Sequence, residues 1–179
     1  MCLKTLLDRL LNRPLTMPYP EEPPDYSRTV DNTRFVLVLQ EWMYRYQVPV
    51  ANYDFWREKV VGEITDKIIH AAQAWEQDGV RHLQMRPEYA NPGVFAHEAC
   101  HISYGLLSDD MRQAFAVAYI MAKGKDKYVK QLYNTKWSQW AGVAGANEYV
   151  EMHAEIGRYI GLKMPTGLRR YYPMILEES

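Results

Sequence analysis

Two histidines one helical turn apart constrain the fold of this chain more than any other feature. They lie in the segment His-Glu-Ala-Cys-His at residues 97–101. Apart from these histidines and Glu98, the residues from Val94 to Ile102 are uncharged. Such a run is typical of a helix that is buried on most of its sides. Because positions i and i+4 of a helix share a face, we expect a buried helix over about 92–107 that directs both imidazoles to one side.

Two imidazoles in this arrangement can bind one Zn²⁺ ion at roughly 2.0–2.1 Å. Glu98 is rotated by about 100° from His97 around the helix axis, which places its carboxylate beside the ion rather than on it. Zinc lowers the pKa of a bound water toward about 7. Glu98 is then expected to accept a proton from that water and pass it to a leaving amine. The alternative is a half-buried helix that carries His97 and His101 by chance.

A catalytic zinc ion needs a third protein ligand. A later segment offers three carboxylates at helical spacing, on Glu148, Glu151 and Glu155. On the helix expected over about 147–162 they share one face, where like charges repel each other by roughly a few tenths of a kcal/mol per pair. A cation would relieve this repulsion, whereas the alternative is a solvated acidic face. His153 projects away from that face and is expected to be a packing or surface residue.

Together the two motifs resemble the gluzincin branch of the zincin metallopeptidases. In the anthrax-lethal-factor-like catalytic domain of that branch, a Glu-x-x-Ala-Glu segment follows the active-site helix, as residues 151–155 do here. The resemblance covers about residues 90–162. It implies a zincin-like fold with a small β-sheet edge beside the active-site helix. It also implies that the zinc ligands are His97, His101 and Glu151, that Glu98 is the general base, and that Glu155 orients a ligand histidine.

The same family places a transition-state-stabilising tyrosine seven residues before the ligand glutamate. This chain has Ala144 at that position. If the resemblance holds, either another tyrosine stabilises the transition state or no tyrosine does so. The candidates are Tyr133, Tyr149 and Tyr104. Zincins also place a strand at the edge of the cleft, where an extended peptide pairs with it. The segment Val80–Arg86 is predicted to be this strand, with His82 either at the surface or in contact with substrate.

The remaining patterns predict an α+β fold that is mostly α. Apolar residues recur at helical spacing over 35–46 and again over about 54–77, where His70 is expected to be structural. Further helices are expected over 108–124 and 125–133. The predicted organisation is an N-terminal helix with a Pro-rich strap, a zincin-like domain and a C-terminal tail, over residues 1–27, 28–170 and 171–179.

Charge and length exclude several classes of protein. The 179 residues carry 21 Lys and Arg against 22 Asp and Glu, for a net charge of −1. No basic excess draws such a chain to nucleic acid or to an anionic membrane. No apolar stretch approaches the roughly 18 residues of a membrane span, and the cysteines, Cys2 and Cys100, form no disulfide framework. A cytoplasmic location is expected by default, with non-classical export left open, and Cys100 is expected to be a small buried residue.

The aromatic content is high and polar, with 14 Tyr and 5 Trp against 4 Phe. Tyrosine and tryptophan favour grooves and interfaces as well as cores. The aromatic cluster between Tyr128 and Tyr149, which includes Trp137 and Trp140, is a candidate substrate wall.

The sequence as a whole predicts a zinc-dependent peptidase that hydrolyses a peptide or protein substrate with metal-activated water. The alternative is a non-catalytic binding module of zincin fold, with a structural zinc and an aromatic surface for a partner. A weaker third interpretation is a metal-dependent hydrolase that acts on a bond other than a peptide bond. The fourth zinc position separates the first two, because an open cleft there favours the enzyme and a fourth protein ligand favours the binding module.

Overall fold

The structure is a computed structural model, and it describes residues 33–143, 145–159 and 163–176. The helix and Pro-rich strap expected over residues 1–27 lie outside the described residues, as does Ala144. No helix in the described part of the chain is long and apolar enough to cross a membrane.

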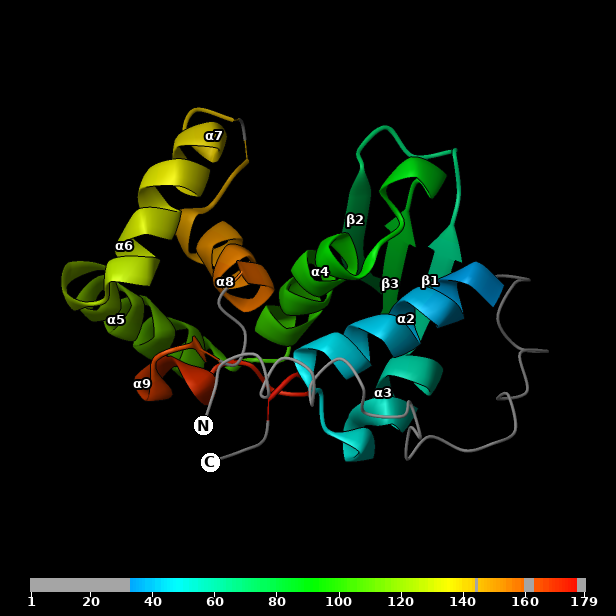
Figure 1. Cartoon of the computed structure of the whole chain (residues 1–179), viewed down its shortest axis with the longest axis horizontal. Coiled ribbons are helices and arrows are strands. Elements are labelled where there is room, and N and C mark those ends of the chain that lie inside the picture. Colours follow the sequence, from blue (N-terminus) through cyan, green and yellow to red (C-terminus); the bar gives the residue numbers. More distant parts are fainter. Residues whose placement is uncertain (1–32, 144, 160–162, 177–179) are drawn as a thin grey trace, which may run out of the picture.

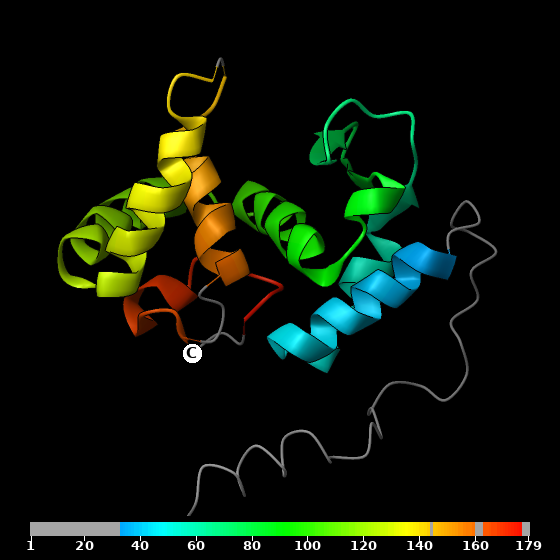
Figure 2. The same ribbon diagram turned by 45° about the horizontal axis from the view of Figure 1, so that its top comes forward.

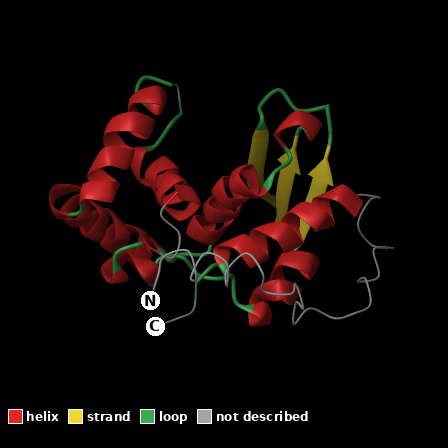
Figure 3. Cartoon of the chain, viewed as in Figure 1, coloured by secondary structure: helices red, strands yellow, loops and turns green. Residues whose placement is uncertain are grey.

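The described residues form an α+β fold that is mostly helical, as the sequence predicts. Figure 1 shows helix α4 in the middle of the molecule, between a sheet-containing part and a group of helices. Figure 3 shows all three strands on one side of α4, away from the C-terminal helices. The first part comprises α2 (Thr33–Tyr46), α3 (Tyr53–Glu58), β1 (Val60–Ile64), β2 (Ala72–Gln77) and β3 (Val80–Met85). After α4 (Pro92–Gly105) come α5 (Asp109–Lys125), α6 (Lys127–Leu132), α7 (Ser138–Trp140), α8 (Glu148–Tyr159) and α9 (Thr166–Arg169).

Helix α2 confirms the first predicted helix. Its apolar residues recur at helical spacing and are buried, and they include Phe35, Leu39 and Trp42. The Trp42 ring packs edge-on against Trp56 of α3, with ring centroids 5.0 Å apart, and lies 4.8 Å from the ring of Phe95 on α4. These contacts attach α2 and α3 to the central helix.

The second predicted helix, over about 54–77, is wrong. Helix α3 ends at Glu58, and the chain then forms β1, a loop and β2. The apolar residues in this region recur every four positions, at Val60, Ile64 and Ile68. An interval of four residues keeps side chains on one face of a strand as well as of a helix, because the strand period is two. The β-branched pair at residues 60–61 favours the strand.

The sheet has the strand order β1-β3-β2, with β3 parallel to β1 and antiparallel to β2. A tight turn at Asp78 and Gly79, both with positive φ, joins β2 to β3, a geometry that is typical of Asp-Gly hairpins. The strand predicted over 80–86 is confirmed as β3, but it occupies the centre of the sheet, and β1 and β2 form its two edges. The predicted edge role of the strand with His82 is therefore wrong. His82 stacks on Trp75 of β2, with ring centroids 4.7 Å apart.

Helices α4 and α8 lie side by side and form the main helical contact of the fold (Figures 1 and 2). Cys100 of α4 is buried as expected and faces Gly157 of α8. His153 of α8 is fully buried and stacks on Tyr172, with ring centroids 3.9 Å apart. Its Nε2 lies 2.6 Å from the carbonyl oxygen of Tyr171. His153 is thus a packing residue, which was one of the two expected roles.

The segment after α9 belongs to the core rather than to a tail. Tyr171, Tyr172, Ile175 and Leu176 are buried. The Ser103 hydroxyl of α4 donates a hydrogen bond of 2.8 Å to the carbonyl oxygen of Pro173. The domain therefore extends at least to Leu176.

Candidate metal centre

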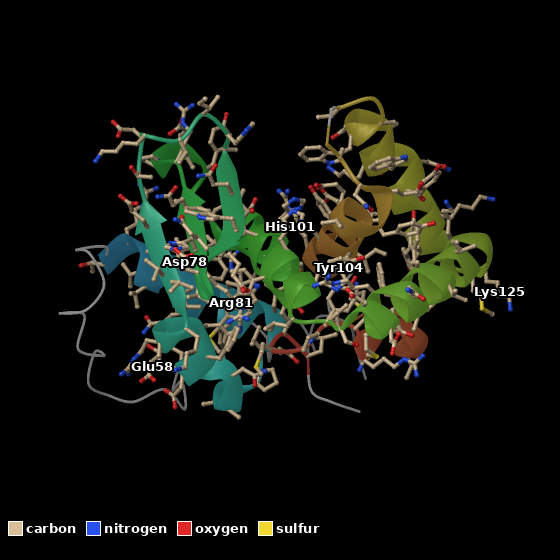
Figure 4. The ribbon with its side chains drawn as sticks, turned by 180° about the vertical axis from the view of Figure 1, so that it is seen from behind. Glu58, Asp78, Arg81, His101, Tyr104 and Lys125 are labelled. Carbon is tan, nitrogen blue, oxygen red and sulfur yellow. The ribbon has the colours of Figure 1, made fainter. Side chains whose placement is uncertain are left out.

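Helix α4 presents His97 and His101 toward α8. Asn91 caps this helix by accepting hydrogen bonds from the backbone N–H groups of Gly93 and Val94, at 3.0 and 3.1 Å, and Pro92 occupies the first turn. The Nε2 atoms of the two histidines lie 3.1 Å apart. Figure 4 shows His101 on the side of α4 that faces α8.

Glu151 of α8 completes a set of three donor atoms. Its Oε2 lies 3.7 Å from the Nε2 of His97 and 3.7 Å from the Nε2 of His101, and the three residues could hold a metal ion. Two ligand atoms bound to one tetrahedral zinc ion at roughly 2.0–2.1 Å lie about 3.3–3.4 Å apart, so the observed separations fit such an ion. The Oε2 of Glu151 is also buried without a hydrogen-bond partner in the described structure, as expected for an atom that binds a cation.

Glu155 lies one turn after Glu151 and contacts the other nitrogen of His97. Its Oε1 is 3.4 Å from the Nδ1 of His97. Burial raises the pKa of Glu155, while Arg158, Lys136 and a hydrogen bond from the Trp140 indole lower that pKa. A carboxylate in this position orients the imidazole and leaves its Nε2 free for a metal.

Burial sets the charge of the centre. It lowers the pKa of His97 to about 3, with a further contribution from His101, and lowers the pKa of His101 to about 4. Both imidazoles are therefore neutral at pH 7 and offer a lone pair. Burial and then Glu151 raise the pKa of Glu98 to about 8, and burial and then Glu155 raise that of Glu151 to about 7. A cation would stabilise the ionised form of both carboxyl groups.

The centre lies in a cleft with a volume of about 700 Å³. The start of β2 forms one wall, and α8 together with the loop that precedes it forms another. Glu98 lines this cleft beside the three donors. The Trp140 ring lies nearly parallel to the ring of His97, with centroids 6.4 Å apart. The other lining residues are largely small and apolar, and include Ala71, Ala72, Ala74, Val94, Val143, Ala146 and Val150.

The acidic stripe expected on α8 divides into two parts. The Oε1 of Glu148 accepts hydrogen bonds from Lys123 Nζ at 2.9 Å and from the Tyr119 hydroxyl at 3.0 Å. Glu148 is therefore held away from the cleft, whereas Glu151 and Glu155 line it.

None of the three candidate tyrosines is among the described residues that line the cleft. Tyr104 packs against Phe115, with ring centroids 6.0 Å apart, and lies farther along α4 than His101 (Figure 4). The Tyr133 ring lies under Lys123 Nζ at 4.0 Å, and the Tyr149 ring packs against that of Tyr119, with centroids 6.1 Å apart. The substrate wall expected from the aromatic cluster is represented in the cleft by Trp140.

Among the ionisable residues of the cleft, sequence reasoning missed Arg158 and His70. Arg158 follows Glu151 by seven positions on the same face of α8, and this spacing is the signal that could have found it. His70, expected to be structural within a helix, instead belongs to the loop before β2 and lines the cleft.

The fold and the site together define an α+β domain with a candidate His-His-Glu metal centre at a cleft. No family model matches the chain, and no curated protein or solved structure was found to be similar to it. The functional proposal is therefore based on the geometry of the centre and on the chemistry of its donors.

Proposed function

We propose that this chain is a zinc-dependent peptidase of the zincin type. The observation that carries the proposal is the convergence of the Nε2 atoms of His97 and His101 and the Oε2 of Glu151 in a cleft that Glu98 also lines. Two imidazoles and one carboxylate are a common ligand set for catalytic zinc.

A bound zinc ion supplies Lewis-acid chemistry, which polarises a carbonyl and makes a water molecule more acidic. The residues of the chain supply the proton transfer and the orientation. Glu98 accepts a proton from the attacking water and returns it to the leaving amine. Its buried position supports this role, because burial raises the pKa of Glu98 and favours the protonated form that returns a proton to the amine, while a bound cation would favour the ionised form that accepts one. Glu155, whose Oε1 lies 3.4 Å from the Nδ1 of His97, is placed to orient that imidazole when a metal binds its Nε2.

Strand β2 supports a peptide as the substrate. It is one of the two edge strands of the described sheet, and β3 pairs with only one of its two sides. The residues at and just before its start line the cleft, and three of them, Ala71, Ala72 and Ala74, have short side chains. An extended peptide can add to such an edge through backbone hydrogen bonds, and this would place its backbone beside the metal centre.

The same cleft favours an enzyme over a binding module with a structural zinc. Structural zinc sites close with four protein ligands, whereas catalytic sites keep one position open. The group of donors in the described residues contains three side chains, and it adjoins a cleft large enough for several residues of peptide.

The test combines metal analysis with hydrolysis of a mixed peptide library followed by mass spectrometry. We expect one zinc per wild-type chain, no tight zinc in His97→Ala or Glu151→Gln, and bound zinc but no hydrolysis in Glu98→Gln. The matched control is Glu148→Gln, which changes a carboxylate on the same helix outside the cleft and should keep both zinc and activity. A folded wild-type protein that takes up no zinc would refute the proposal, as would full activity in Glu98→Gln.

A further inference from the structure

Arg158 is the one Lys or Arg among the described residues that line the cleft. The other ionisable groups there are the carboxyl groups of Glu98, Glu151 and Glu155 and the imidazoles of His70, His97 and His101. Arg158 therefore supplies a fixed positive charge at a place where a ligand can meet it.

The Arg158 guanidinium forms no ion pair within 4.0 Å in the described part of the chain. Its guanidinium carbon lies 4.9 Å from the centroid of the Tyr159 ring, and its Nε lies near Gly93, in the first turn of α4. The backbone at this position is fixed, since the Tyr46 hydroxyl donates a hydrogen bond of 3.0 Å to the Arg158 carbonyl oxygen. A half-buried arginine held in this way has donors available for a ligand.

We infer that Arg158 binds a carboxylate of the substrate, so that the cleft selects peptides with an acidic side chain or a free C-terminal carboxylate near the cleaved bond. This inference rests on the proposed peptidase function and names the substrate class. The planar guanidinium matches a carboxylate with two parallel hydrogen bonds. The rest of the described lining consists of small apolar side chains, the three glutamates, the imidazoles, and the side chains of Gln73 and Trp140, none of which is a guanidinium or an amine.

The position of Arg158 makes it a substrate-binding residue rather than a catalytic one. It follows Glu151 by seven residues, which is about 10.5 Å along the helix axis. Side chains on a helix lean toward its N-terminus, so the guanidinium reaches back toward the metal centre. With about 3.3 Å per residue of extended peptide, the recognised carboxylate lies about two to three residues from the cleaved bond.

The test measures binding separately from hydrolysis, in the Glu98→Gln protein with zinc added. The probes are acetylated and amidated alanine hexapeptides with a single Glu or a single Gln, and a Gln hexapeptide with a free C-terminal carboxylate. The indole N–H signal of Trp140, identified by its loss in Trp140→Phe, reports binding in the cleft by nuclear magnetic resonance. We expect about a tenfold lower Kd for a carboxylate-bearing peptide than for the neutral one. Comparison of the Glu peptide with the free C-terminus shows which carboxylate is recognised.

Substitutions then assign this preference to one side chain. Arg158→Gln should abolish the preference for a carboxylate, Arg158→Lys should retain part of it, and Arg45→Gln, at an exposed site on α2, should leave it unchanged. In the active protein, Arg158→Gln should raise KM for an acidic substrate about tenfold and change kcat little.

Two results would overturn the inference. The first is the absence of a carboxylate preference, seen either as equal Kd values for acidic and neutral peptides or as no binding of either peptide. The second is a carboxylate preference that survives Arg158→Gln. These failures are distinct from failure of the proposed function. Hydrolysis without a carboxylate preference rejects only the role of Arg158. A carboxylate preference without zinc or hydrolysis rejects the peptidase and leaves the binding site.

Discussion

Gly157→Ala is the substitution that most directly tests how α4 and α8 are held together. A Cβ atom at this position would lie closer than 3.0 Å to Cys100 Sγ and 3.1 Å from Cε1 of Tyr172, whereas ordinary contact is 3.4–4 Å. Cys100 and Tyr172 are both buried. The added methyl group must therefore move α8 away from α4 or turn the Cys100 side chain into an occupied core.

Two opposing terms decide the sign of the effect. Alanine is favoured over glycine inside a helix by about 0.8–1 kcal/mol. Overpacking of a core costs about 1–3 kcal/mol. Because the clash involves fully buried atoms, we expect the second term to exceed the first and the free energy of unfolding to fall by about 1–2 kcal/mol. Zinc affinity should fall as well, since Glu151 lies on the displaced helix and ligand sets tolerate errors of only about 0.5 Å.

The assay is urea unfolding with a chelator present, applied to Gly157→Ala, Cys100→Ala and the double variant. The double variant should be more stable than Gly157→Ala alone, because the new methyl group then fills the space left by the removed sulfur atom.

The matched control is Gly124→Ala on α5, where an added Cβ meets nothing within 4 Å. This control should be as stable as the wild type or more stable by up to about 1 kcal/mol. A Gly157→Ala protein as stable as the wild type would refute the argument, as would a double variant no better than the single one.

Three further predictions follow from the site and the sheet. At a free zinc concentration of 100 times its Kd, zinc should stabilise the wild type by about 2.7 kcal/mol in thermal unfolding, and His101→Ala should abolish the effect. Glu155→Gln should lower zinc affinity by about 10- to 100-fold in a chelator competition assay while the circular dichroism spectrum stays unchanged, because it weakens the contact that orients His97. Gly62→Ala should lower the free energy of unfolding by about 1–3 kcal/mol in urea, since its Cβ would overlap the Phe35 ring.

The central helix and its histidines were predictable because the relevant information is local. The i, i+4 spacing places His97 and His101 on one face of any regular helix, whatever surrounds it. The uncharged residues around them predict burial, and the structure shows α4 over Pro92–Gly105 with most of these residues buried. The helix expected over 147–162 is present as α8 for the same reason.

The strands before α4 were only partly predictable. Apolar residues four positions apart at Val60 and Ile64 satisfy the period of a helix and that of a strand equally. In the structure, Gly62 of β1 lets the backbone approach the Phe35 ring of α2, a long-range contact that the local pattern does not show. The order of the strands depends on long-range pairing, so the sequence did not show that β2 rather than β3 forms an edge.

The third donor and the walls of the cleft depend on contacts between elements. Three glutamates on α8 were equivalent by spacing, and the resemblance to a family favoured Glu151. The structure separates them physically, because Lys123 of α5 binds Glu148 while α4 brings its histidines to Glu151. Trp140 of α7 reaches the cleft only through the packing of elements around it, which no local pattern reports, whereas the seven-residue spacing from Glu151 places Arg158 on the same face of α8.

The contact between Cys100 and Gly157 links the stability of the fold to the candidate chemistry. Cys100 follows His97 by three positions and precedes His101 by one, so it projects close to the face that carries the donors. Gly157 lies two positions after Glu155, which contacts the far nitrogen of His97. The small side chain on one helix and the glycine on the other allow the close approach that brings an oxygen of Glu151 within 3.7 Å of both imidazoles. A metal bound to these donors would connect α4 to α8 near the contact between Cys100 and Gly157, so metal binding and helix packing should stabilise each other.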